Sequence, residues 1–90
     1  MNEQAITQRV RDYIMTNLNK AGSDAPLTDA YPLLKSGYID SLSLFTLITF
    51  IEQEFRVEIR PQEIVPDNFA SLNIIAAMVA GKLAVPESVA

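Results

Sequence analysis

The spacing of apolar residues is the feature that most restricts what this chain of 90 residues can fold into. Three segments, 2–18, 40–55 and 71–83, repeat apolar residues at every third or fourth position. That period is typical of one face of an α-helix. The run around 57–59 alternates like a strand, but a single strand has nothing to pair with. The pattern therefore predicts an all-α fold.

Capping residues and prolines indicate where these helices begin and end. Asp40 and Ser41 are both residue types that cap a helix N-terminus, and Ser71 is a third. Pro61 suits the first turn of one short helix that ends before Pro66. The sequence thus predicts three main helices and one short helix. We expect the core to contain Leu47, Ile51, Phe55, Ile59, Ile64 and Ile75.

A long connection separates the first two helices. Gly22 and Pro26 stop the first helix, and the chain then runs to about Ile39. A connection of roughly 20 residues is unusual between helices, so it must be held against the core. The apolar residues available for this are Leu27, Tyr31, Leu33, Leu34 and Ile39. At the other end, 85–90 shows no helical period, so we expect a domain over 1–84 and a flexible tail over 85–90.

The composition excludes most forms of self-contained chemistry. The chain has no cysteine and no histidine, so it can form neither disulfides nor thiolate metal sites, and a serine nucleophile would lack its usual base. The carboxylates do not follow the spacing of a calcium-binding loop. We therefore expect neither an enzyme nor a metal site, and a hydrolase is disfavoured.

The net charge of −4 is concentrated in 36–70, where six acidic residues accompany two arginines. An acidic surface repels nucleic acid and anionic membranes and favours basic partners. The uncharged stretches are too short to span a bilayer, and the first ten residues lack the apolar segment of a signal peptide. We expect a cytoplasmic monomer that neither binds nucleic acid nor inserts into membranes.

The stretch 36–45 reads SGYIDSLSLF and places Ser41 between an aspartate and a leucine. Its residues 37–42 resemble the Gly-x-x-Asp-Ser-Leu motif of the acyl carrier protein superfamily, which includes peptidyl, aminoacyl and D-alanyl carrier proteins. The resemblance continues through LITFIEQEFRVEI, RPQEI and NFASLNIIAAMV and covers nearly the whole chain. It implies a four-helix carrier-protein bundle with a long ordered first loop.

The resemblance also implies a prosthetic group. In the family, the serine of the motif is esterified by 4'-phosphopantetheine from coenzyme A, whose thiol holds acyl, aminoacyl or peptidyl groups as thioesters. The matching residue is Ser41, and an anion there would lie at a helix N-terminus. Asp40 and Leu42 match the positions that phosphopantetheinyl transferases and partner enzymes recognise. The further partners implied are a loading ligase and downstream pathway enzymes.

The second helix departs from fatty-acid carriers, which usually carry acidic residues on its outer face. The corresponding positions are Ser43, Thr46 and Gln53, and Glu52 keeps the remaining charge on that part of the face. This departure favours a specialised pathway, such as a polyketide, a nonribosomal peptide or a dedicated-ligase pathway. The alternatives are a primary fatty-acid carrier and an unmodified helical adaptor that binds a basic partner.

The remaining candidates for partner recognition lie on the same helix. Phe45 and Thr49 are expected to be exposed beside Leu42, although Thr49 could be half-buried. Together with Asp40 and Glu52 they form the set of predicted recognition residues. Phe45 is equally compatible with simple packing.

Overall fold

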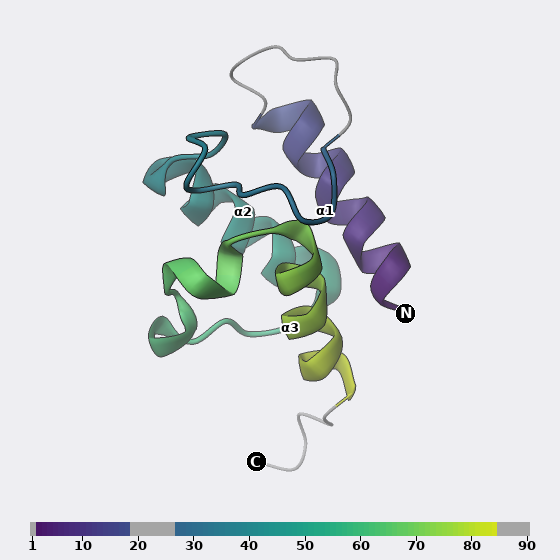
Figure 1. Cartoon of the computed structure of the whole chain (residues 1–90). Coiled ribbons are helices and arrows are strands. Elements are labelled where there is room, and N and C mark those ends of the chain that lie inside the picture. The colour runs from purple at the N-terminus through teal and green to yellow at the C-terminus, as the bar shows by residue number, and fades with distance from the viewer. Residues whose placement is uncertain (1, 19–26, 85–90) are drawn as a thin grey trace.

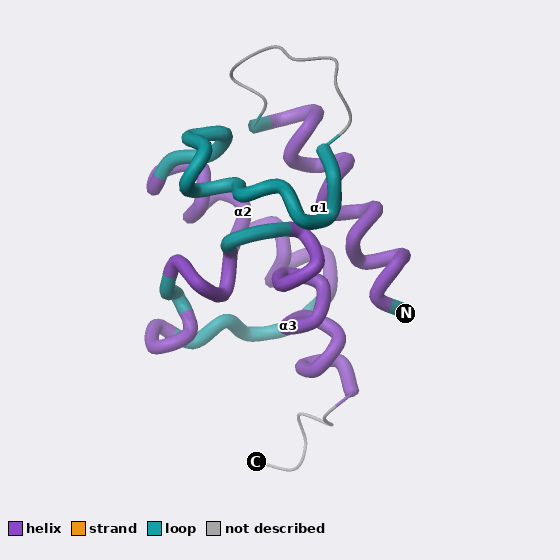
Figure 2. Tube along the Cα trace, in the orientation of Figure 1, coloured by secondary structure: helices purple, strands orange, loops and turns teal. Residues whose placement is uncertain are grey.

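The structure is a computed structural model, and it describes residues 2–18 and 27–84. Within these ranges the chain is helical, and none of the described residues belongs to a strand (Figure 2). The prediction of an all-α fold is therefore confirmed. The predicted tail over 85–90 and the residues Gly22 and Pro26 lie outside the described residues. The elements are α1 (Glu3–Asn17), α2 (Ser41–Phe55), η1 (Pro61–Glu63), η2 (Pro66–Phe69) and α3 (Leu72–Ala84) (Figure 1).

Helix α1 follows the predicted period closely. The Asn2 side chain caps it by accepting a hydrogen bond of 2.8 Å from the Ala5 N–H. Ile6, Val10 and Ile14 are fully buried. Because these side chains recur every fourth residue, one continuous stripe of α1 faces the core and the helix packs against α3.

Helix α2 begins at Ser41, and Asp40 is its N-cap. Its buried apolar residues are Leu44, Leu47, Ile48, Ile51 and Phe55. The helix ends at Phe55 and is followed by its C-cap residue Arg56, whose φ of 56° is left-handed. Tyr13 of α1 stacks on Phe50 of α2 with ring centroids 4.0 Å apart. The predicted core residues of this helix are confirmed.

The segment between α2 and α3 differs from the single short helix predicted for it. Pro61 begins η1 and Pro66 begins η2, so the structure has two short 3-10 helices here. Proline is favoured at the first helical position and cannot continue a preceding helix, because it lacks an N–H donor. The second proline therefore divides the segment. Ile59 and Phe69 are buried, and Ile64 is partly buried against the core.

Helix α3 starts after Ser71, as predicted. The Ser71 carbonyl accepts the Ile75 N–H at 3.1 Å, which is the bond that an N-cap residue makes. Its buried residues are Leu72, Ile75, Ala76 and Val79. Leu83, predicted to continue this stripe, is 41% exposed, because the last turn of α3 extends beyond the buried part of the helix.

The described part of the first connection is held in two ways. Leu27, Leu33 and Ile39 are buried, as predicted, and Leu34 packs against the core. Backbone hydrogen bonds also join the connection to the residues around the start of α3: Leu33 N–H to Ala70 O at 2.8 Å, and Asn73 N–H to Asp29 O at 3.0 Å. Tyr31, also available to hold the connection, is 39% exposed, and its ring meets that of Tyr38 edge-on.

Over residues 2–18 and 27–84, no helix is both long enough and apolar enough to cross a bilayer.

Candidate functional site

Ser41 is the first residue of α2, and its side chain is exposed. The capping interactions are made by its neighbour: Asp40 Oδ1 accepts the Ser43 N–H at 2.8 Å, and Asp40 O accepts the Leu44 N–H at 2.8 Å. Because Asp40 has an extended backbone (φ −104°, ψ −175°), its carboxylate turns back over the first turn. The Ser41 hydroxyl is therefore not needed for capping and lies at the surface.

The surroundings of Ser41 favour an anion more than they favour catalysis. The amides of Ser41 and Leu42 are in the first turn, where backbone N–H groups have no intrahelical acceptor. The positive end of the α2 dipole adds to their attraction for negative charge. The chain contains no histidine that could deprotonate the hydroxyl. The exposed hydroxyl and the first-turn amides are chemically compatible with a phosphate ester on Ser41.

The turn that leads to Ser41 is closed by local hydrogen bonds. The Gly37 N–H donates to Leu34 O at 3.1 Å, and the Ile39 N–H donates to Leu33 O at 3.2 Å. The Ser36 hydroxyl accepts the Tyr38 N–H at 3.2 Å. Ser36 is thus a structural residue of the loop. These bonds set the direction in which the chain enters α2.

Gly37 occupies a backbone conformation that favours glycine, with φ +78°. A Cβ atom at this position would meet nothing within 4 Å. The requirement for glycine therefore comes from the backbone and not from crowding. The glycine of the motif allows the sharp turn before the exposed serine.

Tyr38 lies between this turn and Asp40. Its ring meets Tyr31 edge-on, with centroids 5.8 Å apart and planes at 74°. Burial raises the pKa of the Tyr38 hydroxyl, and the nearby Tyr31 raises it further. The buried hydroxyl of Tyr38 could not be predicted, because the motif leaves this position open to any residue.

The surface of α2 beyond Ser41 is apolar. Leu42 is 78% exposed and Phe45 is 56% exposed, and Thr49 is exposed one turn further on. The hydroxyl of Thr49 donates to Phe45 O at 3.1 Å, and that of Thr46 donates to Leu42 O at 3.3 Å. Since both hydroxyls are bonded to the helix backbone, the face they share offers little free polarity.

The two acidic residues of α2 are already engaged. Glu52 is half-buried, and its Oε2 accepts the Ile59 N–H at 2.9 Å. Glu54 forms an ion pair with Arg9 of α1. The sequence places Glu52 as the remaining charge on the outer face of α2. In the structure its carboxylate is hydrogen-bonded to the backbone of the segment that follows α2.

The position of Ser43 differs from the one expected from the sequence. The sequence places Ser43 on the outer face of α2 together with Thr46 and Gln53, and those two residues are exposed. Ser43 is instead 5% exposed. The reason is helical geometry, because position 43 lies one turn before the fully buried Leu47.

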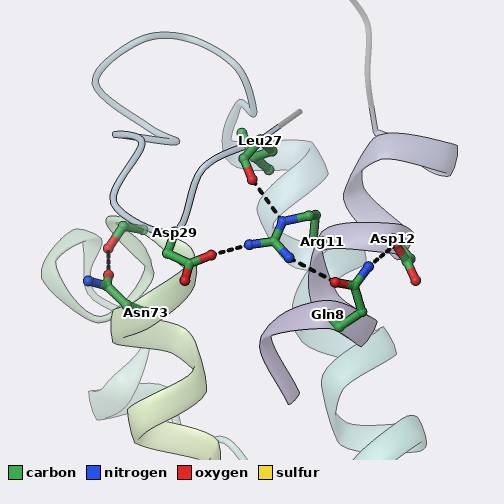
Figure 3. A network of polar contacts seen from close by, with 7 residues as sticks. Gln8, Arg11, Asp12, Leu27, Asp29 and Asn73 are labelled. Carbon is green, nitrogen blue, oxygen red and sulfur yellow. Dashed lines mark hydrogen bonds and ion pairs between the residues drawn. The ribbon is translucent and has the colours of Figure 1, made fainter. Parts of the chain in front are cut away.

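A second polar cluster lies among α1, the connection and α3 (Figure 3). Arg11 donates from Nε to Leu27 O at 2.8 Å and from another guanidinium nitrogen to Gln8 Oε1 at 3.0 Å, and it pairs with Asp29. The adjoining cavity of about 330 Å³ is lined by residues of α1, Asp29 and α3, and by none of α2. It is therefore separate from the Ser41 site. In the ranges that the structure describes, no three acidic side chains gather as a metal site would require.

The chain is similar in sequence to a curated carrier protein. No protein-family model matches the chain. Over 66 residues the chain is 38% identical to the probable acyl carrier protein PigG of Serratia sp. (strain ATCC 39006). The aligned residues cover 73% of this chain and 76% of that relative.

Proposed function

Because the chain belongs to the acyl carrier protein family, we propose that Ser41 carries a 4'-phosphopantetheine arm that holds acyl, aminoacyl or peptidyl intermediates as thioesters. The family consists of carriers and not of enzymes. The observation that carries the proposal is the exposed Ser41 hydroxyl at the start of α2, relieved of capping by Asp40. We place the carrier domain at 1–84 and expect it to act as a cytoplasmic monomer.

The residues present suit the attachment of this group. Ser41 Oγ would form a bond to the phosphorus that bears the pantetheine of coenzyme A, and the pyrophosphate P–O bond would break. Adenosine 3',5'-bisphosphate leaves, and a base of the phosphopantetheinyl transferase takes the hydroxyl proton. The phosphodiester that results lies beside the first-turn amides of α2, where negative charge is favoured. Once attached, the arm supplies the thiol that the chain itself lacks.

The exposed face of α2 supports a specialised pathway. We propose that Asp40, Leu42, Phe45, Thr49 and Glu52 contribute to recognition by the transferase, by a loading ligase and by downstream enzymes. Leu42 and Phe45 offer exposed apolar surface, and the carboxylates of α2 are held by Ile59 and Arg9. Partners that dock on acidic carriers through basic patches would find little free charge on this face. Polyketide, nonribosomal peptide or dedicated-ligase systems therefore fit better than primary fatty-acid synthesis.

The decisive test is the intact mass of the protein after incubation with coenzyme A, magnesium and a broad-specificity phosphopantetheinyl transferase. We expect a gain of one phosphopantetheine, which Ser41→Ala abolishes. The melting temperature of Ser41→Ala should match the wild type, because Asp40 keeps the cap. As matched controls, Ser36→Ala and Ser43→Ala should retain the gain. A wild-type protein that gains no mass would favour the unmodified adaptor instead.

A further inference from the structure

The Tyr38 hydroxyl is the only side-chain polar atom of the described residues that is buried without a hydrogen-bond partner. Buried polar groups are nearly always paired, and an unpaired one costs about 1–3 kcal/mol. A phenylalanine would fill the same space without that cost. The orphaned hydroxyl therefore suggests a partner that joins the protein only in another state.

The position of Tyr38 indicates which state that is. It precedes Ser41 by three residues, so the two Cα atoms are at most about 11 Å apart. Its backbone is held by the Ser36 hydroxyl on one side and by the buried Ile39 on the other. A group attached to Ser41 thus begins within reach of the Tyr38 side chain.

A second aromatic ring lies against Tyr38. Tyr31 meets it edge-on and is itself 39% exposed. Exposed side chains change rotamer within picoseconds to nanoseconds, so Tyr31 can move away from this contact. The backbone of Tyr38 stays held by its hydrogen bond to the Ser36 hydroxyl.

We propose that the Tyr38 hydroxyl donates a hydrogen bond to an amide carbonyl of the phosphopantetheine arm, and so holds the arm against the loop before α2. This inference rests on the proposed modification of Ser41. A phenol is a good donor, and a carbonyl of the arm supplies the acceptor that the folded chain does not. The arm would then spend part of its time folded against its own carrier and not extended into solvent.

The test compares the arm-free and arm-bearing forms of the wild type and of Tyr38→Phe, with loading verified by mass. The arm-free variant should melt at or above the wild-type temperature, because an orphaned hydroxyl has been removed. Attachment of the arm should raise the wild-type melting temperature by about 4 °C more than that of the variant, the shift expected for one hydrogen bond in a domain of this size.

Tyr31→Phe is the matched control, because it removes an exposed hydroxyl from the partner ring. The arm should stabilise Tyr31→Phe as much as it stabilises the wild type. The inference is overturned if the arm stabilises wild type and Tyr38→Phe equally, or if arm-free Tyr38→Phe melts several degrees lower. A wild type that gains no arm overturns the proposed function as well, and the mass measurement identifies that case.

A second readout responds to the hydrogen bond itself. In protein labelled with ¹³C at tyrosine Cζ, the Tyr38 signal is identified by its loss in Tyr38→Phe. A hydrogen bond donated by the neutral phenol disfavours ionisation, so the pKa of Tyr38 should be higher in the arm-bearing form. An unchanged or lowered pKa would contradict the contact.

Discussion

At the scale of single residues, Asp40 and Ser41 have different roles at the start of α2. Asp40 accepts the Ser43 N–H and begins the helix. Ser41 keeps an exposed hydroxyl in the first turn. The aspartate of the motif thus has a structural function that does not depend on any recognition by partner enzymes.

This division predicts different outcomes for two substitutions of Asp40. Asp40→Ala should lower the free energy of unfolding by about 1 kcal/mol, because the Ser43 N–H loses its acceptor. Asp40→Asn keeps an acceptor oxygen and should lose less. Urea denaturation measures both values. If the two variants lose the same free energy, capping is not the structural role of this side chain.

The same pair separates stability from recognition. Asp40→Asn removes the charge while it preserves the cap, so slow loading by the transferase in a stable Asp40→Asn protein would assign recognition to the carboxylate. If the transferase loads Asp40→Asn at the wild-type rate, the charge of Asp40 is not needed for recognition and its role is to cap α2.

At the scale of elements, helix α2 has one buried face and one exposed face that carries large apolar side chains. Leu47 and Ile51 are fully buried, whereas Leu42 and Phe45 are exposed on the side that bears Ser41. Large exposed apolar side chains in a small domain often mark contacts with partners. The two acidic residues of the helix are used within the fold.

Phe45→Ala should therefore slow the turnover of the carrier by its partner enzymes and change the melting temperature little, because the side chain is 56% exposed. Phe50→Ala is the matched control on the same helix. Phe50 stacks on Tyr13, so its removal should lower the melting temperature by several degrees. A large loss of stability in Phe45→Ala would instead place Phe45 in the core.

The second element-scale feature is the ion pair that joins η1 to α3. Lys82 Nζ lies 2.7 and 2.8 Å from the two oxygens of Glu63, and the Arg60 N–H donates to the same carboxylate at 2.8 Å. The hydrogen bond from Lys82, followed by that from the Arg60 backbone, lowers the pKa of Glu63 below its ordinary value of 4.5. The folded protein therefore holds this proton less tightly than the unfolded chain.

The sign of this shift determines a pH dependence. A carboxyl group with a lowered pKa stabilises the fold above its ordinary value, and the contribution disappears as the pH falls through the lowered pKa. Wild type should thus be more stable than Glu63→Gln at neutral pH, and the difference should shrink as the pH falls below about 4.5. Melting curves between about pH 7 and 3 measure it. A constant difference across that range would exclude the ion pair as its source.

At the scale of the whole molecule, Arg11 joins parts of the chain that are distant in sequence. Its guanidinium reaches Leu27 O and Asp29, and the Asp29 carbonyl accepts the Asn73 N–H at 3.0 Å. One side chain of α1 therefore holds the connection beside the start of α3 (Figure 3). The long connection is attached by polar contacts as well as by its buried leucines.

Arg11→Met should lower the free energy of unfolding by about 1.5–3 kcal/mol, because it leaves a partly buried carbonyl without its charged donor. Arg11→Lys should recover only part of this, because an ammonium cannot reproduce the planar fork. The control is Arg9→Met, which breaks an ion pair whose arginine is 51% exposed and should cost less than about 1 kcal/mol. If Arg11→Met and Arg9→Met lower the free energy of unfolding equally in urea denaturation, Arg11 does not hold the connection in place.

The sequence by itself determined the three α-helices and the position of Ser41. The helix period, the caps Asp40 and Ser71, and the break at Pro61 depend on residues within about four positions of one another. Such signals can be read along the chain. The exposed serine at the start of α2 followed from these local rules together with the motif around it.

The tertiary structure alone decided which surface positions are buried and which polar side chains pair with one another. Ser43 is buried, although the sequence placed it on the outer face of α2. Glu52 bonds to the Ile59 backbone, and Glu63 pairs with Lys82, 19 residues away. Burial depends on which elements cover a position, and pairing across such separations depends on how the helices pack. Neither follows from a local pattern, because the same pattern permits several arrangements of its neighbours.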